Sequence, residues 1–154
     1  MPDSDDRRYL VDTNILSVGA PPKRGADARV AEWLDTHSAH LRLSVATITE
    51  IEDGIAKARR QGATTKAQSL ADWLDAIIHL YEDQILPVDV AVAREAGRLL
   101  DRARSRGRAF GLADMLIAAT ARVHGLIVLT RNRKDFVDCD VAVSDPYSGD
   151  LAIL

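Results

Sequence analysis

The chain has 154 residues, of which 47% are hydrophobic and 28% charged, close to the averages of soluble globular domains. We expect neither a membrane span nor a secretory signal, because no apolar run is long enough for the first and the N-terminal residues lack the apolar segment of the second. The single Cys139 cannot form an internal disulfide. These features argue against a membrane protein or a disulfide scaffold and predict a cytoplasmic domain.

The net charge of −3 hides an uneven distribution of charge along the chain. Residues 94–134 carry ten basic side chains and three acidic ones, whereas the remaining residues carry ten basic and twenty acidic ones. A domain divided in this way can present one positive surface to nucleic acid. Solvated helices with exposed arginines explain the same pattern, so charge alone leaves both interpretations open.

The first half of the chain alternates between strand and helix patterns. Residues 1–7 are rich in Asp and Arg and are expected to form a flexible extension before a domain at 8–148. The apolar run 9–11 predicts a strand that stops at Asp12. The next expected elements are a helix at 27–38, a strand at 41–45, and helices at 47–60 and 65–80.

The second half continues the alternation. The expected elements are a strand at 85–88, helices at 90–105 and 112–124, strands at 126–129 and 141–143, and a tail at 149–154. Pro87 cannot donate to a strand ladder and therefore favours an edge position for its strand. Gly125 is typical of the residue that follows a helix C-terminus.

Strands that alternate with helices predict an α/β fold of three layers, with a central, mostly parallel sheet of four to five strands. In such sheets, ligands bind beyond the carboxyl ends of the strands. The polar residues that follow the strands are therefore the candidates for a site.

Five polar residues are predicted to lie at this carboxyl edge. Asp12 directly follows the first strand, and Glu50 lies near the start of the helix after the second. Asp114 begins a helix that must run antiparallel to the strand that follows it, so its N-terminus also starts at this edge. Asn132 and Asp135 follow that strand. Distant segments of the chain therefore bring these side chains together.

Each acid has an ordinary structural explanation when it is considered alone. Asp12 could cap the following turn, Glu50 could complete a capping box with Thr47, and Asp114 could interact with a helix dipole. Three carboxylates at one edge, however, repel one another unless a cation lies among them. Ligands that are all oxygen favour Mg²⁺ or Mn²⁺ over zinc, and such an ion can assist hydrolysis of a phosphodiester.

The segments that contain these residues together resemble the PIN domain, and more narrowly the VapC toxins of bacterial type II toxin–antitoxin pairs, with a leaning to the FitB-like branch. The segments are 10–16, 44–51, 112–121 and 129–132. The resemblance implies an α/β/α fold and an endoribonuclease that depends on Mg²⁺ or Mn²⁺ and cuts structured RNA such as transfer RNA. It also implies a cognate antitoxin and a homodimer.

By position, Asp12, Glu50 and Asp114 match the three acidic metal-site residues of the family. The fourth position is an acid in some relatives and is the neutral Asn132 here. Asp135 could supply the missing carboxylate, directly or through water, or could instead hydrogen-bond within its loop. We treat all five as candidate catalytic residues.

Other residues are given supporting roles. Thr13 and Thr130 match positions from which a hydroxyl would orient the acids. Basic side chains near the edge would hold RNA phosphates without reading sequence. These are Arg98, Arg102, Arg131 and Arg133.

Two other classes of protein fit the same elements. A receiver-like signalling module would accept phosphate on an Asp at this edge, although it needs a paired acidic turn where Asp12 stands alone. A non-catalytic interaction protein of PIN fold would use its acids as helix caps. The apolar faces of 27–38 and 65–80 could line a dimer interface, an antitoxin groove or the core.

Overall fold

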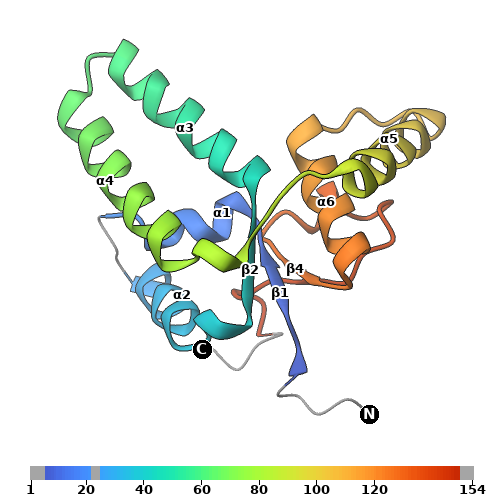
Figure 1. The fold of residues 1–154 in the computed structure, drawn as a ribbon, viewed down its shortest axis with the longest axis horizontal. Coiled ribbons are helices and arrows are strands. Elements are labelled where there is room, and N and C mark those ends of the chain that lie inside the picture. The colour runs from blue at the N-terminus through green and yellow to red at the C-terminus, as the bar shows by residue number, and fades with distance from the viewer. Residues whose placement is uncertain (1–5, 22–24, 150–154) are drawn as a thin grey trace.

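The computed structural model describes residues 6–21 and 25–149, and a five-stranded sheet runs through its middle (Figure 1). The strands are β1 (Tyr9–Val11), β2 (Leu41–Ser44), β3 (Ile85–Leu86), β4 (Ile127–Leu129) and β5 (Val143–Ser144). The α-helices are α1 (Thr13–Leu16), α2 (Gly25–Thr36), α3 (Val45–Arg60), α4 (Thr64–Leu80), α5 (Val90–Ser105) and α6 (Leu112–His124). The predicted extension at 1–7 and tail at 149–154 lie largely outside the described residues.

All neighbouring strands are parallel, in the order β3-β2-β1-β4-β5. The pairing of β1 with β4 places Val11 opposite Leu129. The next residues, Asp12 and Thr130, therefore leave the sheet side by side at its carboxyl edge. The prediction of an α/β fold with a parallel sheet of four to five strands is confirmed.

Helices cover both faces of the sheet because the strands are apolar on both faces. Tyr9 and Val11 of β1 belong to one buried cluster with residues of α2, α3 and α4. Leu10 belongs to a second cluster with residues of α5 and α6. The three layers follow from this alternation, since successive side chains of a strand point to opposite faces. Within the described residues, no helix is both long and apolar enough to cross a bilayer.

The helix ends follow local capping chemistry. The start of α3 at Val45 contradicts the expected start at residue 47, because the hydroxyl of Ser44 accepts a hydrogen bond from the Ala46 N–H at 3.0 Å. Thr47 is instead fully buried. The expected helix at 112–124 is confirmed, and Gly125 ends it in the left-handed conformation with φ of 64°.

Three details of the strand regions differ from the expectations. The edge strand β3 stops at Leu86, one residue before Pro87. The last strand is Val143–Ser144 instead of 141–143, because Val143 pairs with Val128. A short helix, α1, follows Asp12 and buries two apolar side chains where only a turn was expected.

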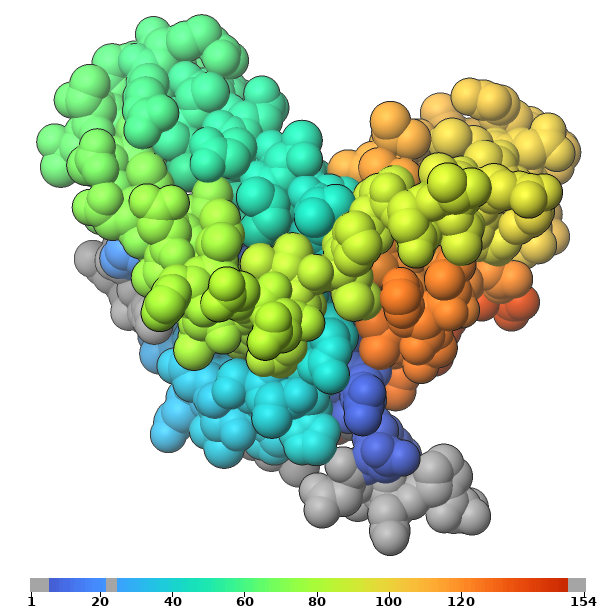
Figure 2. Space-filling view, viewed as in Figure 1, coloured from blue at the N-terminus to red at the C-terminus, as the bar shows by residue number. Residues whose placement is uncertain are grey.

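Two helical arms rise on either side of the carboxyl edge of the sheet (Figure 1). The pair α3 and α4 forms one arm, and the pair α5 and α6 forms the other. Figure 2 shows that the molecular surface is hollowed between the two arms. The residues that follow the strands therefore lie at the base of an open notch.

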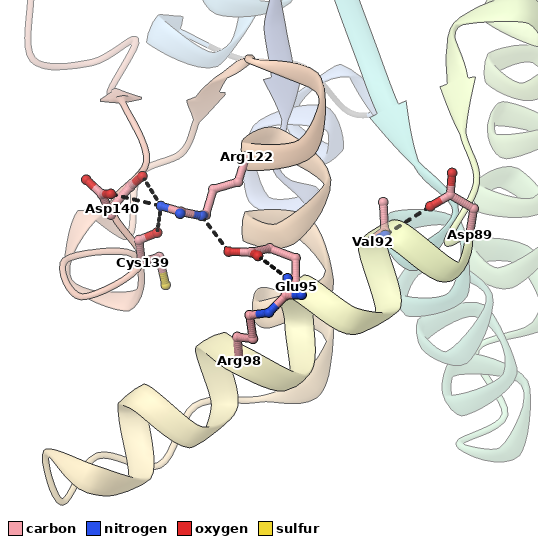
Figure 3. Close-up of polar contacts among 7 residues, drawn as sticks. All are labelled: Asp89, Val92, Glu95, Arg98, Arg122, Cys139 and Asp140. Carbon is pink, nitrogen blue, oxygen red and sulfur yellow. Dashed lines mark hydrogen bonds and ion pairs between the residues drawn. The ribbon is translucent and has the colours of Figure 1, made fainter.

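The C-terminal end of α6 is held by a network of ion pairs and hydrogen bonds around Arg122 (Figure 3). The guanidinium donates to Glu95 of α5 at 2.6 Å and to the carboxylate and carbonyl oxygens of Asp140 at 3.0 and 2.8 Å. Glu95 also accepts from Arg98 at 2.9 Å. Burial opposes the charge of Glu95, but the hydrogen bonds from Arg98 and Arg122 outweigh it and lower the pKa of this carboxyl.

Candidate active site

Asp12 is the most buried acid at the carboxyl edge, with 4% of its surface exposed. It caps α1, and its Oδ1 accepts from the Thr13 N–H at 2.8 Å. Burial raises the pKa of Asp12, while the hydrogen bonds from Thr130 and Thr13 offset part of that rise. Asp12 therefore caps α1 with its Oδ1, as one of the two explanations expected. Its Oδ2 accepts a hydrogen bond from a different segment of the chain.

That second oxygen is held by Thr130, the residue after β4. The Thr130 hydroxyl donates to Asp12 Oδ2 at 2.7 Å. It accepts in turn from the backbone N–H of Asn132 at 3.0 Å and the side-chain amide of Asn14 at 3.3 Å. Thr130 is fully buried, so the carboxylate and its hydroxyl partner form a fixed pair.

Glu50 lies on the exposed side of α3, in the second turn of the helix. The capping-box explanation for Glu50 is wrong, because Ser44 and not Thr47 caps this helix. Glu50 instead accepts a hydrogen bond of 2.6 Å from the hydroxyl of Thr13, which begins α1. Thr13 therefore links the segment after β1 to the helix after β2.

Asp114 lies in the first turn of α6, at the same edge. Burial, followed by the negative charges of Asp12, Asp135 and Glu50 in that order, raises its pKa to about 6. Two of these neighbours, Glu50 and Asp135, also raise the pKa of Asp12. Four carboxylates from four segments therefore repel one another across this edge.

The structure separates the two candidates for the fourth position. Asn132 is exposed, and its backbone N–H donates to Thr130. Asp135 ends a 3-10 turn at Arg133–Asp135, where its backbone N–H donates to the Asn132 carbonyl at 3.0 Å. The charge of Asp135 acts on both Asp12 and Asp114, whereas Asn132 has no charge to contribute.

The four candidate phosphate-binding arginines fall into two groups. Arg131 and Arg133 lie in the loop that begins with Thr130, and both are exposed. Arg98 is ion-paired with Glu95, and the charge of the half-buried Arg102 acts on Cys139. The described contacts of the second group are with α5 and the loop before β5 and include none of the four carboxylates.

Two residues at this edge were not anticipated from the sequence. Asn14 donates to Thr130 and accepts from the Arg131 N–H at 3.3 Å, so its amide joins α1 to the loop after β4. The central carbon of the Arg131 guanidinium lies over the Tyr147 ring, 4.0 Å from the ring centre. The position of Asn14, two residues after Asp12, was an available signal; Tyr147 had none.

The donor chemistry of the edge suits a hard divalent cation. Its ligands would all be oxygens, and a cation would relieve the repulsion that, together with burial as the larger cause, raises the pKa of Asp114. Within residues 6–21 and 25–149, no three acidic, histidine or cysteine side chains are arranged closely enough to form a ready-made metal site. The donor set fits Mg²⁺ or Mn²⁺, and the carboxylates would have to draw together around the ion.

The arrangement does not favour a covalent nucleophile. Burial, followed by the charge of Asp138, raises the pKa of the Cys139 thiol to about 11. Cys139 is buried and therefore unsuited to attack a substrate. The expectation that Cys139 is unreactive agrees with this environment, although burial contributes more than the neighbouring charge.

Comparisons with known proteins agree with this geometry. The PIN domain family matches residues 9–141. The toxin FitB of Neisseria gonorrhoeae is 34% identical over 140 residues, which cover 90% of this chain and 97% of FitB. The VapC ribonuclease Y4jK of Sinorhizobium fredii is 29% identical over 139 residues, covering 90% of this chain and 96% of the relative. The crystal structure of FitAcB from Neisseria gonorrhoeae superposes with a TM-score of 0.77 at 34% identity, over 91% of this chain and 99% of the other.

Proposed function

This chain belongs to the PIN-domain family, and we propose that it is a metal-dependent endoribonuclease that acts as the toxin of a toxin–antitoxin pair. Its relatives include a protein named a toxin and one named a ribonuclease, and each aligns with this chain over nearly its whole length. A nuclease is therefore favoured over a receiver-like module.

The observation that carries the proposal is the convergence of Asp12, Glu50, Asp114 and Asp135 at one edge of the sheet. Structural caps need no such convergence, since each would serve its own helix. Burial and, after it, the repulsion from neighbouring carboxylates raise the pKa of Asp114, and both cost the protein stability when the group is ionised. A bound cation would turn that repulsion into affinity, which favours a metal-binding role.

We propose that Asp12, Asp114 and Glu50 hold the ion, with Asp135 completing the site. When bound, Mg²⁺ or Mn²⁺ would activate water and hold a phosphate oxygen for hydrolysis of the phosphodiester. Thr130 fixes the orientation of the Asp12 carboxylate, and Thr13 fixes that of Glu50. Asn132 contributes through its backbone contact with Thr130.

The open notch and the basic side chains beside it suit an RNA substrate. Arg131 and Arg133 would contact phosphates near the reacting bond, and Arg98 and Arg102 would hold phosphates farther along α5. Contacts of this kind recognise backbone charge rather than sequence. The resemblance to VapC toxins favours structured RNA such as transfer RNA as the substrate.

The proposal also includes partners. A toxin of this family implies a cognate antitoxin, and FitB, the relative at 34% identity, is named a toxin. The family resemblance further implies a homodimer in the cytoplasm, where the buried, unpaired Cys139 stays reduced.

The test is cleavage of total bacterial RNA by the purified chain with Mg²⁺ or Mn²⁺ and with EDTA, read by sequencing the new RNA ends. Asp114→Asn should lower the cleavage rate by at least about 100-fold, because a Lewis-acidic ion contributes several kcal/mol to such a reaction. The matched control is Asp75→Asn, the same change at an exposed position of α4. Its rate should equal that of the wild type.

Two outcomes would contradict the proposal. A wild-type chain that leaves total RNA uncut with either metal would favour a non-catalytic interaction protein. An Asp114→Asn variant that cuts at the wild-type rate would remove Asp114 from the metal site.

A further inference from the structure

Arg131 directly follows Thr130, and its side chain is held against an aromatic ring. Its guanidinium carbon stands 4.0 Å from the centre of the Tyr147 ring. Its backbone N–H donates to the side chain of Asn14. The preceding residue, Thr130, binds Asp12 directly. The Arg131 backbone is therefore tied to the site, and its side chain is tied to Tyr147.

Tyr147 is itself anchored at two points. Its hydroxyl donates a short hydrogen bond to Asp27 in the first turn of α2. Its backbone N–H donates to the Asp145 side chain at 2.9 Å. Burial, together with the hydrogen bond to Asp27, raises the pKa of Tyr147 to about 12, so the hydroxyl remains a donor at neutral pH. The ring can therefore hold the guanidinium in one place.

A guanidinium that stacks on a ring keeps N–H donors that an ion-paired guanidinium uses. A guanidinium that stacks through its face keeps its in-plane N–H groups free to donate. Arg106 and Arg108 both spend their N–H groups on Asp138, and Arg122 spends its own on Glu95 and Asp140. Among the contacts of the described residues, Arg131 has no ion pair with a carboxylate. It is held in position without being neutralised.

We propose that Tyr147, anchored by Asp27, is a positioning residue that presents the edge of the Arg131 guanidinium to a phosphate of the RNA substrate next to the metal site. This inference rests on the proposed function and adds to it the device that orients the phosphate contact. Phosphate is the group that a planar, forked donor matches best, because two parallel N–H groups can bind two of its oxygens.

The experiment is a double-mutant cycle read by binding of fluorescently labelled bulk transfer RNA in EDTA, where cleavage does not interfere. Arg131→Ala should weaken binding about tenfold and reduce the slope of log affinity against log salt by about 0.7 to 0.9, as expected for one lost phosphate contact. Tyr147→Leu should weaken binding about threefold to fivefold, the range of a cation–π contact. The double variant should bind no more weakly than Arg131→Ala alone, because the ring acts only through Arg131.

A parallel cycle provides the control. Arg60→Ala removes an exposed arginine in the last turn of α3, and its effect should add to that of Tyr147→Leu without coupling. Tyr147→Phe keeps the ring and removes the hydroxyl, and it should restore most of the lost affinity. If Tyr147→Leu melts at a much lower temperature than the wild type, Tyr147→Met replaces it in the cycle with Arg131→Ala, since Met removes the aromatic ring and its flexible side chain fills the space that is left.

The outcomes separate this inference from the proposed function. Coupling between Arg131 and Tyr147, together with metal-dependent cleavage by the wild type, supports both. Additive losses, or an Arg131→Ala variant that binds as tightly as the wild type, overturn the positioning role even when the wild type cuts RNA. A wild type that neither binds nor cuts RNA overturns the proposed function and this inference with it.

Discussion

The two ends of α6 carry ionised groups in opposite situations. At its N-terminus, Asp114 faces three other carboxylates, and its pKa is raised to about 6 by burial and by their charges. At its C-terminus, Arg122 is ion-paired with Glu95 and Asp140, and the pKa of Glu95 is lowered. One helix therefore joins a cluster of repelling charges to a cluster of compensated ones.

The comparison shows how a buried charge that stabilises the fold differs from one that belongs to a binding site. The Arg122 cluster contains its own counter-ions and fastens α5, α6 and the loop before β5 together. The ion pairs named above, all among the described residues, join no basic side chain to the four carboxylates of the edge. Their charge would therefore have to be balanced by a ligand. Perturbed pKa values occur at both ends, but only a cluster left uncompensated indicates a binding site.

The largest expected effect on stability comes from breaking the compensated end. Arg122→Met should lower the free energy of unfolding by about 2 kcal/mol, because it leaves Glu95 partly buried without this cation and frees the Asp140 backbone. Thermal melting should show a drop of about 4–8 °C for a chain of this size. Arg104→Met on exposed α5 surface is the control and should change stability by less than about 0.5 kcal/mol. Equal effects of the two changes would show that the Arg122 network contributes nothing.

The uncompensated end should respond with the opposite sign. In EDTA, Asp114→Asn should raise the free energy of unfolding by about 1 kcal/mol, since it removes one of the repelling charges, with solvent screening reducing the full effect of the pKa shift. Added Mn²⁺ should stabilise the wild type and leave this variant unchanged. Chemical denaturation with and without Mn²⁺ measures both quantities, with Asp75→Asn as the control. A loss of stability in EDTA would mean that Asp114 is structural.

The smallest effect is the pH dependence of the compensated end. The pKa of Glu95 is lowered from its ordinary 4.5, so its stabilising contribution is present above that value and is lost as the pH falls through the lower folded-state pKa. Between pH of about 6 and about 3, the stability difference between the wild type and Glu95→Gln should shrink by less than about 1 kcal/mol. Urea titrations at both pH values test this, and a difference independent of pH would exclude Glu95 as the titrating group.

Much of the framework could be predicted because it depends on local pattern. The helix at 112–124 was correctly bounded, since its apolar spacing ends at Gly125, whose φ of 64° suits glycine. The parallel arrangement was predictable from the alternation of strands and helices, and it placed Asp12 and Asp114 at one edge. The start of α3 was wrong because Ser44 and Thr47 are both suitable caps, and burial of Thr47 decides between them.

The remaining features depend on side chains that meet from distant segments. The stack of Arg131 on Tyr147 and the ion pairs of Arg122 with Glu95 and Asp140 leave no pattern in the sequence. The uneven distribution of charge was visible, but the destination of each arginine was not. The basic segment 94–134 supplies ion-paired arginines on α5 and α6. It also supplies the exposed Arg131.

The hydrogen bond between Thr130 and Asp12 joins residues that are 118 positions apart in the chain. Because this partner of Asp12 directly follows β4, the site forms only after β4 has paired with β1. During synthesis, the first hundred residues can collapse and bury apolar surface, but they lack Asp114, Thr130 and Asp135 altogether. A growing chain on the ribosome therefore cannot assemble this carboxylate edge until its synthesis is nearly finished.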